Sequence, residues 1–396
     1  MQYLRTQYLL AFGALGAIVP FQPMLLHNIG ISDWHLGLIL ATPGLAAVLS
    51  PILVSYIADR HLSSRKLIVG SYLISALALA GLFFLSSVEA VIALTLVLNF
   101  LYAPAIALLD VVSLHALRHN LTAGMSEREF PLVRRWGSVG FMLPAIALAA
   151  LTSLLAIPPE VVYLIGASLS GVAAFFALAL PELPPEAKRS RELPTLSALR
   201  LLFTPPLAPL IWALFIASIG VSMFYFIMPR YLQELGLSMG VVGLVVILGV
   251  AWEIVLLSIA PRVLERWGTR ATTIGGFGLT AVRFLLLAAI PSVAVAALTQ
   301  ILHAPLILVL AVILPVIFTQ AATPETRNSV LGVASSIYNG FARIIGPPIA
   351  GAILALPHGS DLDQLRAAFA VGALFCAIGT AMLFIWFKPR LPAIKV

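Results

Sequence analysis

Two ionisable residues lie inside apolar stretches of the sequence, where they could bind a proton or contact a polar solute. Arg283 belongs to the run 281–290, and His303 belongs to the run 294–305 that follows a turn at Pro291. If each run is a membrane-crossing helix, a rise of about 1.5 Å per residue places Arg283 roughly 10 Å and His303 roughly 15–20 Å from the turn. A guanidinium in hydrocarbon costs at least about 3 kcal/mol. We therefore expect both side chains to face a water-filled path or a bound solute.

Proton coupling at these residues requires an acid, and Glu253 is the candidate that the sequence offers. Glu253 lies in the apolar run 249–256, roughly 10–12 Å inward from the end of its helix. An acid whose protonation depends on a nearby cation can couple proton binding to solute movement. We expect Glu253 to pair with Arg283 and to carry the proton, with His303 in a lesser role. The alternative is a structural ion pair that joins the two helices.

A second polar pair is expected in the first half of the chain. Arg134 lies roughly 10 Å along its helix, and Asp110, at similar depth in the preceding helix, is its counter-charge. Arg134 can bind a carboxylate through two parallel hydrogen bonds. Gln300 shares a helical face with His303, which favours a role in lining the same site. For Gln22 the alternatives are a solute contact and a hydrogen bond to a neighbouring helix.

The composition indicates that a membrane positions these residues. Of the 396 residues, 61% are hydrophobic and 10% are charged, whereas soluble domains carry about 25% charged residues. Apolar segments of about 20 residues recur along the chain, each able to cross a bilayer as a helix. The sequence therefore predicts an all-α integral membrane protein with twelve transmembrane helices. They are expected at 7–28, 35–57, 66–86, 89–117, 127–156, 160–181, 206–230, 239–261, 271–290, 293–319, 328–356 and 364–387.

The distribution of Lys and Arg predicts the orientation of these helices. The loops after odd-numbered spans hold only Arg230 and Arg366, while the loops after even-numbered spans and the two termini hold most of the other loop cations. By the positive-inside rule both termini lie in the cytoplasm, and we expect a multi-pass protein of the inner or plasma membrane. The net charge of +7 is then a topology signal, and no nucleic-acid partner is expected.

A polar stretch at 181–194 divides the chain into two groups of six spans. We expect an N-terminal six-helix bundle at 1–183 and a C-terminal six-helix bundle at 205–396. The cytoplasmic linker at 184–204 contains a partly apolar segment, 196–203, which is either an interfacial helix or a plain connection.

The two halves repeat each other. Similar charged residues follow the second and eighth spans, with acids 206 positions apart. The first set is Asp59, Arg60 and Arg65, and the second is Glu265, Arg266, Gly268 and Arg270. The pattern Arg134-x-x-Gly137 also recurs as Arg343-x-x-Gly346, 209 positions later. Parallel six-helix repeats predict two pseudo-symmetric halves that work by alternating access.

Four motifs, in order along the twelve spans, resemble the major facilitator superfamily over nearly the whole chain. They are Pro20-Phe21-Gln22-Pro23 with His27 in span 1, Phe130 to Phe141 in span 5, Val282-Arg283 in span 9 and Leu302-His303 in span 10. Within the superfamily the chain is similar to the branch of lactose permease, the phenylpropionate permeases and the nucleoside–proton symporters. The charged motif after span 2 departs from the superfamily pattern, since Ser55 and Leu62 stand where glycine is usual.

The resemblance implies a proton-coupling group. Arg283 and His303 match the arginine and histidine of the lactose permease cluster, but the place of its glutamate is Leu306 here. Glu253 resembles the span-8 glutamate of the phenylpropionate-type permeases, which implies that it binds the proton. Asp110 is the next candidate.

The resemblance also implies a solute site and a gate. Arg134 matches the sugar-contacting arginine of lactose permease, and Phe141 stands where that protein has a Trp under the sugar. The place of its span-4 acid is Ala107, one turn before Asp110. These departures favour an aromatic or aliphatic carboxylate at least as much as a galactoside. The charged motifs after spans 2 and 8 imply a conformational gate.

The leading interpretation is a secondary active transporter that moves a small organic solute together with protons. The solute could be an aromatic or aliphatic carboxylate, a sugar or a nucleoside. The alternatives are an exporter or passive facilitator of the same fold, and a membrane receptor or scaffold that does not transport.

Other chemistries are not predicted. The sequence contains no Gly-rich phosphate loop and no nucleophile–His–acid set, so neither an ATP-driven pump nor an enzyme is expected. His303 has no Cys or second His at ligand spacing, so no metal is expected. We expect a monomer in a lipid bilayer that uses the proton gradient as its energy source and needs no cofactor.

Overall fold

The structure, a computed structural model, describes residues 2–60, 63–85, 87–118, 130–155, 157–182, 194–205, 207–323, 326–357 and 359–387. Within these ranges it leaves out the side chains at 50–60, 118, 131, 153–154, 194–195 and 327–328. All elements in the described ranges are helices, and no β-strand occurs among them. The prediction of an all-helical fold is therefore confirmed.

The helices of the first half of the chain are few and long. They are α1 (Gln2–Ile18), α2 (Gln22–Asn28), α3 (Asp33–Arg60), α4 (Ser64–Phe84), α5 (Val88–Arg118), α6 (Phe130–Leu154) and α7 (Val161–Ala177).

The second half contains more pieces, because two of its spans are interrupted by 3-10 or π turns. Its elements are α8 (Pro194–Leu202), α9 (Ala208–Glu234), α10 (Met239–Ser258), α11 (Ala260–Ala289), α12 (Val293–Leu298), η2 (Thr299–His303), α13 (Ala304–Leu308), η3 (Val309–Ile313), α14 (Leu314–Ala321), α15 (Arg327–Ser335), η4 (Ser336–Phe341), α16 (Ala342–Leu354) and α17 (Asp361–Trp386).

Nine helical segments of the described chain are long and apolar enough to cross a membrane. Asp33–Leu49 and Val161–Ala177 are apolar but shorter, and the eleventh expected span corresponds to α15, η4 and α16. Within the described residues, each of the twelve expected spans therefore coincides with a helix or with a run of consecutive helices.

The segment between expected spans 8 and 9 is helical where the sequence predicted a loop. α11 already begins at Ala260, and its backbone turns at Gly268, where φ is 72°. A left-handed φ favours glycine because glycine has no Cβ to clash. The charged residues Glu265 and Arg266 therefore lie on a helical turn, with their side chains exposed.

The tenth expected span changes its helical pitch twice. η2 is a 3-10 helix and η3 is a π-helix. Such irregular turns inside a helix are often found at functional sites. η2 carries both Gln300 and His303.

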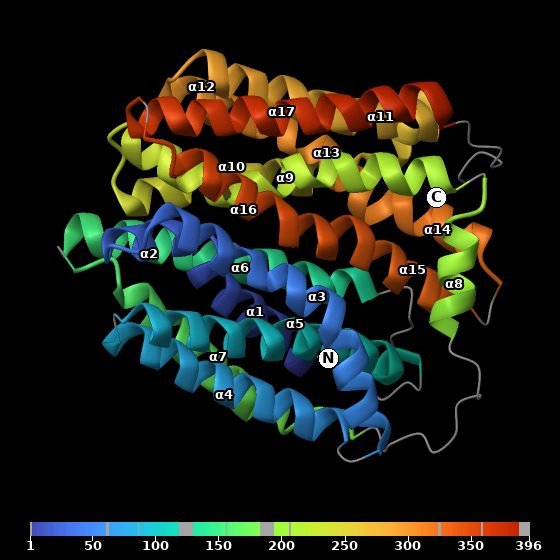
Figure 1. Cartoon of the computed structure of the whole chain (residues 1–396). Helices are drawn as coiled ribbons and strands as arrows, with labels where there is room; N and C mark the ends of the chain where they lie inside the picture. Colours follow the sequence, from blue (N-terminus) through green and yellow to red (C-terminus); the bar gives the residue numbers. More distant parts are fainter. Residues whose placement is uncertain are drawn as a thin grey trace. The chain divides into compact units, whose positions relative to one another are not determined.

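The chain forms two compact units. The first comprises Met1–Ile31, Leu45–Arg189 and Ser238–Leu244, and the second comprises Ser32–Gly44, Ser190–Leu237 and Val245–Val396. In the first unit, α1 packs against α6 and α7, and α4 packs against α5 and α7. In the second unit, α9 lies between α16 and α17 (Figure 1) and packs against both.

Glycines let helices within each unit approach until their backbones touch. In the first unit, a Cβ on Gly16 would lie 2.0 Å from the carbonyl oxygen of Phe141, and a Cβ on Gly140 would lie 2.1 Å from that of Leu9. In the second unit, a Cβ on Gly346 would lie 2.5 Å from the carbonyl oxygen of Ile219. These contacts join span 1 to span 5 and span 7 to span 11, the same relation in both halves of the sequence.

Candidate functional site

In the second unit, Glu253 of α10 and His303 of η2 form a direct polar contact. Oε1 of Glu253 lies 3.0 Å from Nε2 of His303, and the two side chains are 19% and 12% exposed. Ionisable groups inside membrane helices are costly and generally functional. This pair is therefore the candidate proton-binding site of the second unit.

Arg283 lies beside this pair and has a different partner. Its Nη2 donates a hydrogen bond of 2.7 Å to Oε1 of Gln300. Its guanidinium carbon lies 4.3 Å from the centroid of the Phe224 ring. Arg283 and Gln300 are 1% and 2% exposed, so an amide oxygen and an aromatic face replace the water that a guanidinium would otherwise bind.

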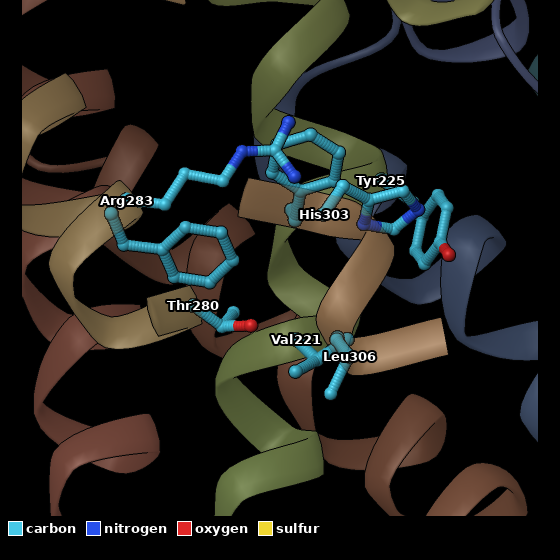
Figure 2. A pocket seen from close by; sticks show the side chains of 8 residues that line it. Val221, Tyr225, Thr280, Arg283, His303 and Leu306 are labelled. Atoms are coloured by element: carbon cyan, nitrogen blue, oxygen red, sulfur yellow. The ribbon is translucent and has the colours of Figure 1, made fainter. Parts of the chain in front are cut away.

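A small cavity of about 10 Å³ lies beside Arg283 and His303. It is lined by Val221, Phe224, Tyr225, Thr280, Arg283, Phe284, His303 and Leu306. Figure 2 shows Arg283, His303 and Tyr225 at one end of the cavity and Val221 and Leu306 at the other. A cavity of this size has room for about one water molecule, so a larger solute can enter only after the surrounding helices move.

The observed partners differ from the expected pair of Glu253 with Arg283. No ion pair between these two residues occurs in the described chain, and each binds a residue of η2 instead. Residues three apart in a 3-10 helix lie above one another, so Gln300 and His303 are presented together. Gly249 leaves the space that this requires, because a Cβ there would lie 2.9 Å from Oε1 of Gln300.

In the first unit, Asp110 of α5 and Arg134 of α6 lie together, as their similar depth predicted. Oδ1 of Asp110 is 3.5 Å from Nε of Arg134 and accepts a hydrogen bond of 2.5 Å from the hydroxyl of Tyr8. The guanidinium of Arg134 lies 4.0 Å from the centroid of the Phe12 ring. An acid, a cation and two aromatic rings thus form a second polar site.

The other predicted solute contacts of the first unit are engaged in helix packing. Gln22 is buried, and its Nε2 donates a hydrogen bond of 3.5 Å to Oγ1 of Thr95. This contact is the helix-to-helix alternative that the sequence left open. Phe141 is half-buried, and its backbone lies against Gly16.

Sequence reasoning missed the aromatic residues around both polar groups. In the first unit, Tyr8 and Phe12 lie one turn apart on α1 and both face Arg134. In the second unit, Phe224 stacks on Phe284 with centroids 5.6 Å apart. The i, i+4 spacing of Tyr8 and Phe12 was a signal, but the sequence did not show which helix would face them.

The repeated charged motifs make corresponding contacts in the two units. Nη2 of Arg65 lies 2.7 Å from Oε2 of Glu182, beyond the end of α7. Arg270 donates hydrogen bonds of 2.6 and 2.7 Å to the carbonyl oxygens of Phe384 and Phe387 at the end of α17. The two arginines are 205 positions apart (270 minus 65), close to the offsets of the other repeats.

Two further members of the predicted gate, Asp59 and Arg60, have side chains outside the described residues. Glu265 and Arg266 are exposed on the first turns of α11, and Gly268 forms the turn of that helix. A gating role for all of these residues stays a prediction.

Glu182 allows the contact with Arg65 to be tested through the pH dependence of stability. The hydroxyl of Ser63 donates a hydrogen bond of 2.7 Å to Glu182, and together with Arg65 it holds the pKa of the Glu182 carboxyl below its usual value of 4.5. A carboxyl with a lowered pKa stabilises the fold above its unfolded-state pKa, and this contribution is lost as the pH falls through the folded-state pKa. We expect Glu182→Gln to lower the melting temperature slightly at neutral pH, with a difference from wild type that shrinks below pH 4.5.

Thermal unfolding of the purified protein in detergent at a series of pH values measures this difference. Glu234→Gln is the matched control, since Glu234 is exposed at the end of α9 and has no ion pair in the described chain. A difference for Glu182→Gln that does not change with pH, or that merely equals the control, would contradict the stabilising contact.

Comparisons with known proteins show that the chain is similar to proteins that transport solutes across membranes. The profile of the MFS_1 like family matches residues 1–360. Over 262 residues the chain is 26% identical to YegT of Escherichia coli K12, a protein for which nucleoside transport is itself inferred; the match covers 64% of this chain and 60% of YegT. Over 153 residues it is 30% identical to the nucleoside permease NupG of the same organism, covering 38% of this chain and 34% of NupG. The matches thus span less than two thirds of either relative.

The likeness to solved structures extends over nearly the whole chain. A crystal structure of the nucleoside transporter NupG superposes with a TM-score of 0.83 and 20% identity, covering 98% of this chain and 99% of that one. A crystal structure of a mutant of the same transporter superposes with a TM-score of 0.87 and 19% identity over the same shares. At this identity the matches show the fold alone. They confirm the predicted fold class.

Proposed function

This chain belongs to the MFS_1 like family, and on that premise we propose that it carries nucleosides across a membrane together with protons. Its family and its relatives are transporters, so the expected superfamily and the expected lack of enzymatic function are confirmed. It is a multi-pass membrane protein. The choice of nucleosides and the coupling to protons are proposals.

The contact between Glu253 and His303 is the observation that carries proton coupling. When Glu253 is ionised, its carboxylate accepts the hydrogen bond from Nε2 of His303 at 3.0 Å. Protonation of Glu253 removes its negative charge and weakens that bond. His303 is then released toward the cavity, which it lines together with Arg283. Proton binding and the shape of the solute site are coupled through this single contact.

The nucleoside as solute is supported by the two relatives and by the side chains around the cavity. A nucleoside presents a flat aromatic base and a ribose rich in hydroxyl groups. Phe224 lines the cavity and already stacks on His303, with centroids 6.2 Å apart, so a base stacks there only once His303 has moved away; stacking is favourable for a planar ring. Beside the cavity, the amide oxygen of Gln300 is bound by Arg283, which leaves the amide nitrogen to donate hydrogen bonds to a solute. These features suit a base and a sugar together better than a simple aliphatic carboxylate.

For the remaining candidate residues we propose the roles that the resemblance to the major facilitator superfamily implies. We propose Arg283 and His303 as partners of the proton site, and Asp110 as a second acid. We further propose solute contacts in the first unit for Arg134 and Asp110 and for Gln22 and Phe141, which pack between helices in this structure, and in the second unit for Gln300. The gate would comprise Asp59, Arg60, Arg65, Glu265, Arg266, Gly268 and Arg270. The protein would work as a monomer in the inner membrane with both termini in the cytoplasm, driven by the proton gradient and without a cofactor.

Uptake by proteoliposomes tests this proposal. With an inward proton gradient, vesicles that contain the protein should accumulate radiolabelled uridine or adenosine above the external concentration, and a protonophore should abolish the accumulation. Benzoate and a galactoside serve as comparison solutes, and empty vesicles serve as the blank. Equilibration without accumulation would indicate a passive facilitator, and accumulation only under an outward proton gradient would indicate exchange or export. If no tested nucleoside enters faster than into empty vesicles, the nucleoside proposal is wrong.

A further inference from the structure

An open apolar groove lies at one end of the second unit. Its volume is about 440 Å³, and it is lined by Pro205, Ala208, Pro209, Trp212, Met382 and Trp386. Its walls are therefore the start of α9, the segment just before that helix, and the end of α17. None of these residues lines the cavity beside Arg283 and His303, so the groove has no role in the proposed transport cycle.

The two tryptophans of the groove indicate its depth in the membrane. α9 and α17 are both long and apolar enough to cross a bilayer. Trp212 lies in the second turn of α9, and Trp386 is the last residue of α17; the two residues are 48% and 53% exposed. Tryptophan is enriched where hydrocarbon meets the lipid headgroups, because its ring is apolar and its N–H is polar. We therefore expect the groove to open toward lipid at this level of the bilayer.

The short helix α8 extends the apolar surface beside the groove. Ala198 and Leu202 on one face of α8 are buried, and the helix packs against α15. Leu199 and the following residue Phe203 are each 40% exposed, and the ring centroid of Phe203 lies 5.6 Å from that of Trp212. In Figure 1, α8 runs across the direction of α9 and α17. A short helix in this orientation with apolar residues outside is typical of a helix that lies in the membrane interface.

Two exposed arginines flank the apolar walls. Arg200 lies on α8, one turn before Phe203, whose ring contacts Trp212. On the other side, Arg270 donates hydrogen bonds to the carbonyl oxygens of the residues that flank Trp386, at positions 384 and 387. Among the described residues these bonds use Nη2 and Nε of Arg270, which leaves Nη1 to bind a phosphate.

The sequence around the groove is rich in cations and poor in acids. No Asp or Glu occurs in 193–233 or in 364–396, and α17 is followed in the sequence by Lys388, Arg390 and Lys395. On the first turns of α11, Arg262 and Arg266 outnumber Glu265. Clusters of cations next to a membrane helix attract anionic lipids. A water-soluble anion would leave the apolar walls uncovered, and a neutral lipid would leave the cations without a counter-charge.

We propose that this groove is a binding site for an anionic phospholipid, such as phosphatidylglycerol. An acyl chain of the lipid fills the groove against Trp212, Met382 and Trp386, where it buries apolar surface on both sides. The phosphate lies among the cations at the rim of the groove, where Arg200 and Arg270 donate charge-assisted hydrogen bonds to it. The site lies wholly within the second unit and requires neither a solute nor a proton.

Quenching of tryptophan fluorescence by lipids with brominated acyl chains tests this proposal. One variant keeps Trp386 and has Phe in place of the other tryptophans of the chain. The matched control keeps only Trp34, which is also near a helix end and 45% exposed but follows Asp33 at the start of α3. In phosphatidylcholine vesicles, we expect brominated phosphatidylglycerol to quench Trp386 several-fold more than an equal fraction of brominated phosphatidylcholine. The two lipids should quench Trp34 equally. Equal quenching of Trp386 by both lipids would overturn the proposal.

Native mass spectrometry of the protein with all its tryptophans tests the arginines. We expect the wild-type protein to retain phosphatidylglycerol through detergent washing several-fold better than phosphatidylcholine, and Arg200→Gln with Arg270→Gln to remove this preference. Arg366→Gln is the control, because Arg366 also donates to a backbone carbonyl, that of Ala288, but lies near the opposite end of α17. An unchanged preference in the double variant would contradict headgroup binding by the two arginines. Neither readout involves uptake of a solute, so failure of the proposed transport function would leave both unaffected.

Discussion

We expect Glu253→Gln to abolish proton-driven accumulation while exchange of solute across the membrane continues. Glutamine retains the shape of the side chain and an oxygen that can accept the hydrogen bond from His303. In the wild-type protein the two atoms of this bond are 3.0 Å apart. Unlike glutamate, glutamine cannot bind a proton. One pH unit corresponds to 1.36 kcal/mol, or about a factor of ten. Under an inward gradient of about two units, symport with one proton can therefore accumulate the solute up to about 100-fold. The variant should reach only equal concentrations on the two sides.

The measurement compares gradient-driven uptake with counterflow, in which labelled solute exchanges against unlabelled solute without a gradient. Counterflow requires solute binding and helix movement, but no net proton transfer. Glu160→Gln is the control, since Glu160 lies outside the membrane helices, just before α7. Accumulation by Glu253→Gln at the wild-type level would show that the proton binds elsewhere, and Asp110 would be the next residue to replace.

The positions of the helices could be predicted because apolar length alone determines them. A run such as 364–387 contains only one charged residue, Arg366, and a segment of this kind is stable in a bilayer only as a helix. The structure places α17 at Asp361–Trp386. The turn at Gly268 within α11 could not be predicted in the same way, because a glycine in a polar segment is compatible with a loop, a helix end or a bend.

The pairing of Asp110 with Arg134 could be predicted, whereas that of Glu253 could not. Asp110 and Arg134 are opposite charges at similar depth on consecutive spans, so depth was a sufficient guide. Glu253 had two possible cationic partners, Arg283 and His303. Which of the two residues contacts Glu253 depends on the 3-10 turn η2, in which successive residues are rotated by about 120° instead of the about 100° of an α-helix. No residue type in Thr299–His303 requires that turn.

We expect Gly140→Val to be the most destabilising of the substitutions considered for the first unit. The Cβ that valine adds would lie 2.1 Å from the carbonyl oxygen of Leu9, more than 1 Å inside the ordinary contact range that begins at 3.4 Å. The obstacle is backbone, so it cannot be relieved by turning a side chain, and α1 and α6 have to separate. Separation removes the packing of both helices, including the approach of Gly16 to Phe141. We expect a loss of about 3 kcal/mol or more, at the upper end of the cost of overpacking.

Thermal unfolding in detergent, together with the yield of monodisperse protein, measures this effect. Gly70→Ala on α4 and Gly171→Ala on α7 are the controls, because a Cβ at either position would meet nothing within 4 Å. In a helix interior, alanine is favoured over glycine by roughly 0.8–1.0 kcal/mol, so these controls should leave the melting temperature unchanged or raise it. A melting temperature that falls for Gly140→Val but stays the same or rises for the two controls distinguishes a close helix contact from a general intolerance of larger residues in this unit. Equal melting temperatures for Gly140→Val and the controls would mean that α1 and α6 do not touch at this point, and the placement of Tyr8 beside Asp110, which depends on the packing of α1, would then have to be revised.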